Sequence, residues 1–135
     1  MIRIGFTGTR KGMTETQFKA LRLILVSQFS PLSEFHFGDC VGADAEGAAI
    51  AKAIGYVLHS HPPDKSILRA FVEADMVYSP KAPLDRNRDI ASICQLLIAT
   101  PAQNVEVIRS GTWATVRYAR AMRKRVIVLE REKVL

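Results

Sequence analysis

Short apolar runs alternate with longer amphipathic stretches along the chain. Apolar runs of four or five residues are typical of buried strands, and the stretches between them repeat apolar residues at helical spacing. Strands are expected at 2–6, 34–37, 56–59, 96–99 and 126–129, and helices at 14–29, 43–54, 86–93 and 112–123. Because strands that alternate with helices pair in parallel through right-handed crossovers, this pattern predicts an α/β fold.

The expected sheet is mainly parallel and doubly wound, with about five strands in the order 3-2-1-4-5. Residues 60–85 are the least regular segment, because four prolines interrupt it, although a helix of two turns fits 66–74. The chain has 135 residues, of which 48% are hydrophobic. This size and composition predict a single domain over 1–135 with an ordinary core.

Three short glycine loops, at 8–10, 38–44 and 110–112, each follow an apolar run and each open a helix. In a parallel sheet every strand-to-helix turn emerges at the carboxyl edge, so the three loops should face one crevice. Helix starts present free N–H groups and the positive end of the helix dipole, which favour anions. A tight turn alone explains any single loop, but three converging loops favour a nucleotide site.

The loop residues have distinct expected roles. Gly8 and Gly38 would let the backbone approach a ligand closely, and Gly42 would permit a positive φ. The hydroxyl groups of Ser110 and Thr112 would donate hydrogen bonds to phosphate oxygens. These residue types therefore predict a site for a phosphate-bearing ligand.

The charge balance favours an anionic partner. The chain has 19 Lys and Arg against 13 Asp and Glu, a formal net charge of +6. Nucleotides and nucleic acid both satisfy this preference. Arg10 would give a phosphate a bidentate contact, whereas the basic residues of the last helix fit a solvated face equally well.

Several other classes of protein and of binding site are disfavoured. With only Cys40 and Cys94, a disulfide framework is not expected, and neither a signal-type leader nor an apolar run of about 18 residues is found. A cytoplasmic protein without a membrane partner is therefore expected. His36, His59 and His61 lack zinc-type spacing, so no metal site is predicted. The sequence also lacks the P-loop and dinucleotide-binding glycine patterns.

Four segments in order resemble motifs of the SLOG superfamily, which includes DNA-processing protein A, the YspA-like and YpsA-like proteins and the LOG enzymes. The segments are GFTGTR at 5–10, HFGDCVGAD at 36–44, LDRNRDI at 84–90 and SGTWAT at 110–115. The resemblance implies a Rossmann-like three-layer sandwich and homodimers or larger homo-oligomers. Its members bind nucleotides or their derivatives, hydrolyse N-glycosidic bonds, carry molybdenum cofactor or bind single-stranded DNA.

The primary expectation is a sensing or carrier module that binds a nucleotide-derived ligand and needs no obligatory cofactor. The residues expected to bind the ligand are Gly8, Thr9, Arg10, Gly38, Asp39, Gly42, Ala43, Asp44, Arg86, Asn87, Arg88, Ser110, Gly111, Thr112 and Trp113. Trp113 fits either base stacking or core packing. One alternative is single-stranded DNA binding, in which Arg86 and Arg88 would follow the backbone of a strand rather than clamp a phosphate.

A second alternative is hydrolysis of a nucleotide N-glycosidic bond. Thr115 stands where the resemblance to LOG enzymes implies a catalytic glutamate, and a threonine does not replace a carboxylate in that chemistry. The remaining carboxylate candidates are Asp39, Asp44 and Glu106. Asp44 also has a purely structural explanation, because a carboxylate in the first turn of a helix is stabilised by the dipole.

Overall fold

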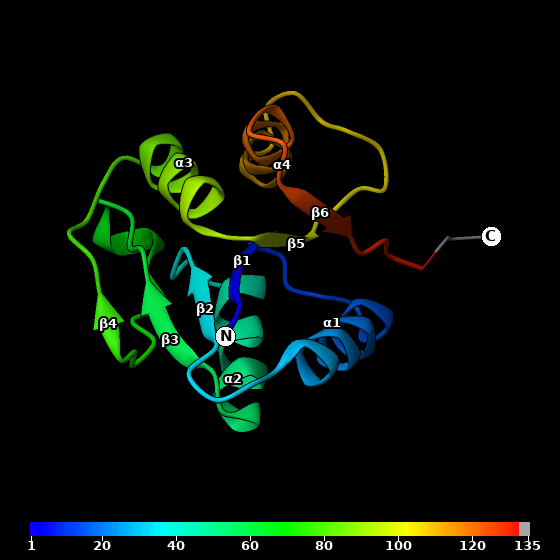
Figure 1. Ribbon diagram of the computed structural model, residues 1–135. Helices are drawn as coiled ribbons and strands as arrows, with labels where there is room; N and C mark the ends of the chain where they lie inside the picture. Colours follow the sequence, from blue (N-terminus) through cyan, green and yellow to red (C-terminus); the bar gives the residue numbers. More distant parts are fainter. Residues whose placement is uncertain (133–135) are drawn as a thin grey trace.

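The computed structural model describes residues 1–132 as helices packed on both faces of one sheet (Figure 1). The strands are β1 (Arg3–Gly8), β2 (Glu34–Phe37), β3 (Val57–Ser60), β4 (Met76–Val77), β5 (Leu96–Thr100) and β6 (Arg125–Val128). The helices are α1 (Glu15–Gln28), α2 (Ala43–Ile54), α3 (Pro83–Ile93) and α4 (Gly111–Ala121), and Ser66–Leu68 forms a 3₁₀ turn. The predicted α/β class is confirmed.

The sheet is parallel throughout, in the order β4-β3-β2-β1-β5-β6. The order expected for five strands is present within it, and the prediction misses only β4, which pairs with β3 at the edge. β4 has two residues, and so short a segment carries no alternation for a pattern to detect.

The two-turn helix expected at 66–74 is wrong, because only the 3₁₀ turn forms there. Beyond that turn the backbone bonds to the loop after β2 instead of continuing a helical ladder. The N–H of Ala70 donates to the carbonyl of Asp39, and the N–H of Val72 donates to the carboxylate of Asp39. Tertiary hydrogen bonds therefore replace the local ones that a helix would need.

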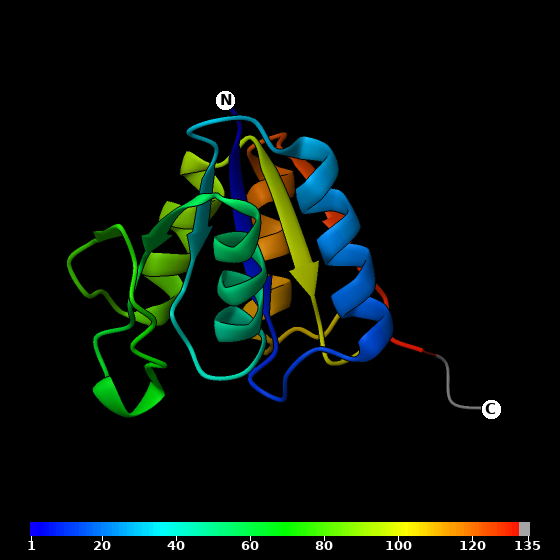
Figure 2. The same ribbon diagram turned by 90° about the horizontal axis from the view of Figure 1, so that it is seen from below.

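Two hydrophobic clusters lie on the two faces of the sheet, as the layers in Figure 2 show. α1 and α2 cover the face that contains Phe6, Phe35 and Phe37. α3 and α4 cover the other face, where Trp113 packs. β5 is buried on both sides, which explains why its sequence is a continuous apolar run rather than an alternating one.

Local signals in the sequence are present at helix ends. Thr14 and Gln17 form a capping box at α1, and Gly55 ends α2 with a φ of 122°. Cys40 and Cys94 are both buried and free. None of the helices described in residues 1–132 is long and apolar enough to cross a membrane.

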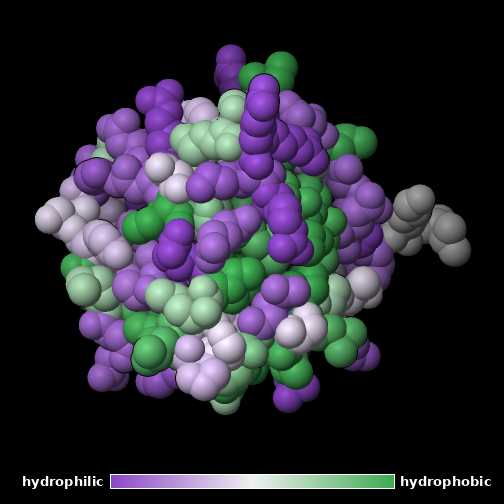
Figure 3. Space-filling view, viewed as in Figure 1, coloured by the Kyte–Doolittle hydropathy of each residue, from purple (hydrophilic) through white to green (hydrophobic). Residues whose placement is uncertain are grey.

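In the upper part of Figure 3, where α3 and α4 lie, hydrophilic side chains predominate, with smaller hydrophobic patches between them. Arg120 and Arg123 are exposed there, and Arg117 pairs with Glu106 at 3.2 Å. This arrangement agrees with a solvated basic face on the last helix.

Candidate functional site

A cavity of about 350 Å³ opens at the carboxyl ends of β1 and β2, beside the start of α4. It lies at the topological switch point between β1 and β5, where the order of the strands across the sheet reverses. Ten of the residues expected to bind a ligand line it: Gly8, Thr9, Arg10, Gly38, Asp44, Arg86, Asn87, Ser110, Gly111 and Thr112. The three glycine loops therefore converge on one pocket.

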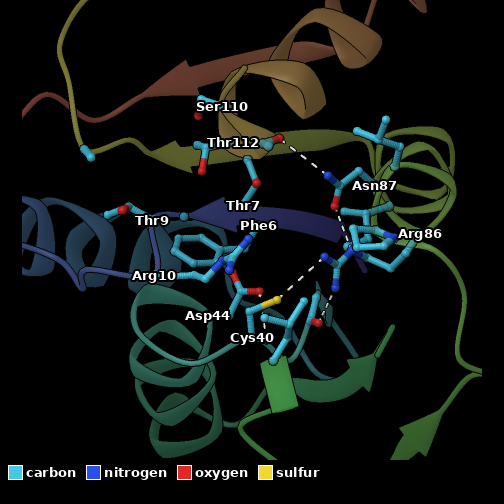
Figure 4. Close-up of a pocket in the computed structure, with 18 of the residues that line it drawn as sticks. Phe6, Thr7, Thr9, Arg10, Cys40, Asp44, Arg86, Asn87, Ser110 and Thr112 are labelled. Atoms are coloured by element: carbon cyan, nitrogen blue, oxygen red, sulfur yellow. Dashed lines mark hydrogen bonds between the residues drawn. The ribbon is translucent and has the colours of Figure 1, made fainter. Parts of the chain in front are cut away.

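Figure 4 shows how the pocket is arranged around the end of β1. Arg10, Cys40 and Asp44 lie on the α2 side, and Ser110 and Thr112 lie on the α4 side. The two sides come from parts of the chain that are distant in sequence, so the pocket depends on the order of the sheet.

Asp39 and Arg88 do not line the cavity, contrary to the expectation from sequence. Asp39 is fully buried, and its carboxylate accepts hydrogen bonds from Arg69 at 3.0 Å and from the N–H of Val72 at 2.9 Å. Arg88 is exposed on α3, with its guanidinium 4.9 Å from the centre of the Tyr118 ring. Both side chains serve contacts outside the pocket.

Gly42, Ala43 and Trp113 also lie behind the pocket lining. Gly42 has the expected positive φ, 91°, and a Cβ there would lie 2.7 Å from the Cα of Arg10. The N–H of Ala43 donates to the carbonyl of Thr9 at 3.0 Å. Trp113 is 5% exposed and belongs to the α3–α4 core, so of the two interpretations core packing is correct.

Gly8 and Gly38 are required by packing within the protein rather than by the approach of a ligand. A Cβ on Gly8 would lie 2.5 Å from the Oγ1 atom of Thr100. A Cβ on Gly38 would lie 2.6 Å from Nη1 of Arg86 and 2.9 Å from Oδ2 of Asp44. Both glycines line the cavity, but the space beside each is filled by the protein's own side chains.

Arg86 is 6% exposed and is held by internal hydrogen bonds. Its Nη1 donates to the carbonyls of Gly38 and His61, and its Nε donates to Asn87 Oδ1 at 2.7 Å. Its Nη2 lies 3.7 Å from the sulfur of Cys40. Arg86 thus joins α3 to the ends of β2 and β3 and forms a wall of the pocket.

Asp44 is the one carboxylate among the residues that line the cavity. It is 5% exposed, Oδ2 accepts from the N–H of Cys40 at 3.2 Å, and Oδ1 is buried without a partner among the described residues. Burial raises the pKa of Asp44 to about 6, although the charge of Arg86 opposes the rise. The pocket therefore contains a carboxyl group that changes its charge near pH 6.

Cys40 also lines the pocket, but its thiol is not activated. Burial, together with the charge of Asp44, raises the pKa of Cys40 above its ordinary value. A thiol with a raised pKa is a poor nucleophile at neutral pH. Cys40 therefore serves as a small residue that fits the loop.

The start of α4 presents polar groups to the cavity. Ser110 caps the helix by accepting a hydrogen bond from the N–H of Trp113 at 3.3 Å. Asn87 donates to the carbonyl of Gly111 at 3.5 Å and so ties α3 to this turn. The positive end of the α4 dipole therefore faces the pocket, as an anion site requires.

Two cationic residues at the pocket were not singled out from the sequence. Lys11 and Arg109 both line it and are exposed, as Arg10 is. Each is next to a residue that sequence analysis placed in the site, and this adjacency was the available signal. Together with Arg10 they leave the pocket mouth strongly positive.

The other two carboxylate candidates lie elsewhere. The carboxylate of Asp39 binds Arg69, and Glu106 is an exposed residue paired with Arg117. Thr115, at the position of the glutamate implied by the resemblance, donates its hydroxyl to the carbonyl of Gly111 at 2.9 Å within α4. Of the three candidates, Asp44 alone is in position to meet a ligand in this pocket.

No family model matches the chain, and no curated protein matches it by sequence. Solved structures do match. The chain is similar to a molybdenum cofactor binding protein from Rippkaea orientalis, with a TM-score of 0.73 and 21% identity over 97% of this chain and 77% of that one. It is also similar to a molybdenum cofactor carrier protein from Chlamydomonas reinhardtii, with a TM-score of 0.64 and 20% identity over 94% and 75% of the chains.

A third similar structure is DNA processing protein A from Helicobacter pylori, described as having a single-stranded DNA binding mode. Its TM-score is 0.67, with 17% identity over 97% of this chain and 66% of that one. These likenesses confirm the Rossmann-like fold that the resemblance in the four motifs implies. At these identities the likeness concerns the fold.

Proposed function

We propose that the chain binds a phosphate-bearing, nucleotide-derived small molecule in this pocket and acts as a carrier or sensing module. The observation that carries the proposal is the convergence of Arg10, Lys11 and Arg109 with the N-terminus of α4 around one cavity. Its volume, about 350 Å³, lies in the range of small-molecule sites, roughly 300–1,000 Å³.

The pocket offers contacts to two parts of such a ligand. The α4 start, with Arg109 next to it, and Arg10 from the α2 side would hold the phosphate, because free N–H groups and guanidinium groups both prefer anions. Asp44, on the α2 side, lines the cavity and would accept a hydrogen bond from a sugar hydroxyl or a heterocycle N–H of the ligand. A buried acceptor of this kind favours ligands that carry a donor there.

The structural comparisons support the same class of function. Two of the similar proteins bind or carry the molybdenum cofactor, and one binds single-stranded DNA. The pocket, with its enclosed carboxyl group, favours a small ligand over a strand. The molybdenum cofactor and nucleotide derivatives are therefore the first ligands to test.

The experiment compares Arg10→Gln with Arg88→Gln in calorimetric titrations of nucleoside phosphates, ADP-ribose and molybdenum cofactor. A charge-assisted hydrogen bond contributes about 1.5–3 kcal/mol, so the loss of Arg10 should weaken binding roughly 10- to 150-fold. Arg88 also belongs to one of the four sequence motifs but lies outside the pocket. Arg88→Gln should therefore bind the ligand as tightly as the unaltered protein. Equal effects of the two variants would contradict the proposal.

Hydrolysis of an N-glycosidic bond is a second candidate, and the position of Asp44 favours it. A carboxyl group with a pKa of about 6 in a pocket is suited to general acid or base catalysis near neutral pH. The titrated mixtures should be analysed by chromatography for released base. If base is released and Asp44→Asn abolishes the release, the protein is a hydrolase. If the ligand stays intact, the carrier or sensing function is supported.

Single-stranded DNA binding is distinguished by its dependence on salt. A plot of the logarithm of the binding constant against the logarithm of the salt concentration would have a slope of about −0.7 for each phosphate contacted. Affinity for a short oligonucleotide with that slope, and none for small ligands, would replace the carrier proposal. The same samples should be measured by light scattering, where we expect a homodimer or larger oligomer.

A further inference from the structure

A cluster of histidines lies outside the pocket, on the strands β2 and β3. Side chains alternate along a strand, so Glu34 and His36 point to the same face of the sheet, opposite to Phe35 and Phe37. The register pairs His36 directly with His59 on β3. The ligand atoms of Glu34, His36 and His59 all lie within 4.8 Å of one another.

The distances within this cluster fit the donors of a small metal site. His36 Nε2 is 2.8 Å, and His59 Nε2 is 3.7 Å, from Glu34 Oε1. Bonds of 2.0–2.1 Å in a tetrahedral arrangement place neighbouring donor atoms about 3.3 Å apart. The rings of His36 and His59 stack with centroids 4.3 Å apart and an angle of 29° between their planes, so these rings must turn before both Nε2 atoms point at the same ion.

Each histidine is also oriented by a second partner at its other ring nitrogen. His36 Nδ1 is 2.9 Å from His61 Nε2, and His59 Nδ1 is 3.0 Å from the hydroxyl of Tyr78. Such outer hydrogen bonds are typical of metal-binding histidines, because they fix the ring and its tautomer. With Nε2 free to bind an ion, Nδ1–H of each ring would donate to these partners.

The cluster of Glu34, His36 and His59 is partly accessible to solvent. His36 is fully buried. The side chains of Glu34 and His59 are 20% and 12% exposed, so the cluster meets solvent on one side. Ions can therefore reach it without opening the fold.

We propose that Glu34, His36 and His59 bind one divalent transition-metal ion of the zinc class. Two imidazole nitrogens and one carboxylate oxygen form a donor set that Zn²⁺ accepts, and three protein ligands leave a fourth position for water. The sequence shows no metal-binding motif here, because two of the ligands come from β2 and the third comes from β3. This proposal differs from the expectation from sequence that the chain has no metal site. The proposal does not depend on the ligand pocket.

The first experiment titrates Zn²⁺ and Co²⁺ into tag-free, chelator-treated protein. One Zn²⁺ should bind per chain, and Co²⁺ should give the visible absorption of a nitrogen- and oxygen-ligated ion. Glu34→Gln and His59→Gln should each weaken Zn²⁺ binding at least 100-fold. Glu130→Gln, a matched change at an exposed residue, should leave the affinity unchanged.

A graded variant separates a metal site from a hydrogen-bonded cluster that only stabilises the fold. Tyr78→Phe keeps the ring stacked 4.1 Å from His61 but removes the hydroxyl that holds His59. Loss of such an outer partner should weaken metal binding about 10- to 100-fold. A cluster without a metal role would show a lower melting temperature and no change in metal affinity.

Ring nitrogen NMR of the unaltered protein keeps the test independent of whether the variants fold. Added Zn²⁺ should shift the Nε2 signals of His36 and His59 by a large amount, and that of His61 by less. The proposal is overturned if stripped protein takes up no zinc, if zinc binds equally well to Glu34→Gln and His59→Gln, or if these two Nε2 signals do not move.

Discussion

Replacement of Asp44 by Asn should stabilise the unliganded protein at neutral pH. The pKa of Asp44 rises from 3.8 to about 6, chiefly because burial disfavours the charged form. A rise of about two units corresponds to about 3 kcal/mol of destabilisation when the folded protein must ionise this group. Asn has no charge to bury and can still accept the hydrogen bond from the N–H of Cys40.

The size of the effect changes with pH in a defined window. Below pH 3.8 Asp44 is protonated in both the folded and unfolded states, so its titration contributes nothing. Between pH 3.8 and 6 the folded state keeps a proton that the unfolded state has lost, so stability falls as pH rises. Above pH 6 the penalty is complete and constant.

The assay is urea unfolding of both proteins between pH 4.5 and 8, where one cooperative transition is expected for a single domain. The free energy of unfolding of Asp44→Asn minus that of the unaltered protein should increase with pH and level off near 3 kcal/mol. Asp64→Asn, at an exposed aspartate, should give a flat difference. A flat difference for Asp44→Asn would refute the reasoning and show that the charge of Arg86 offsets burial, and a difference that falls with pH would show that Arg86 dominates.

Three further changes test the packing of the site by the same unfolding measurement. Gly8→Ala would force a methyl group against Ala43 and should cost about 1–3 kcal/mol, whereas a methyl group at Gly111 would lie 3.8 Å from Nδ2 of Asn87, an ordinary contact, and should be nearly neutral. Ser110→Ala removes the cap of α4 and should cost about 1 kcal/mol, and equal stability would contradict the capping role. Gln17→Ala leaves two buried carbonyls without their donor and should cost about 2–3 kcal/mol, since each loses a bond of 2.9–3.0 Å.

The layout of strands and helices could be predicted because it depends on patterns within each element. The apolar runs, the capping box at Thr14 and the glycine after α2 are local signals, and the structure contains all of them. β4 and the segment after Ser66 could not be predicted in the same way. Their conformation depends on hydrogen bonds to β3 and to Asp39, which are far away in sequence.

The position of the pocket could be predicted, but the roles of its residues could be predicted only in part. A parallel sheet brings every strand-to-helix loop to one edge, so the meeting of the three loops follows from topology alone. Which side chains then face the cavity depends on packing between loops. Asp39 and Asp44 have the same chemistry and lie five positions apart, yet one binds Arg69 and the other lines the pocket.

Arg86 shows why a charged residue in a motif need not contact the ligand. Its guanidinium already donates to two carbonyls and to Asn87, and a ligand phosphate would have to compete with these bonds in a buried position. Breaking them would leave buried acceptors unsatisfied, at about 1–3 kcal/mol each. The exposed cations Arg10, Lys11 and Arg109 have no such cost, so they are the residues that should select an anionic ligand. Because Arg86 also bonds to the backbone of His61, it holds the ligand pocket and the histidine cluster on one common support.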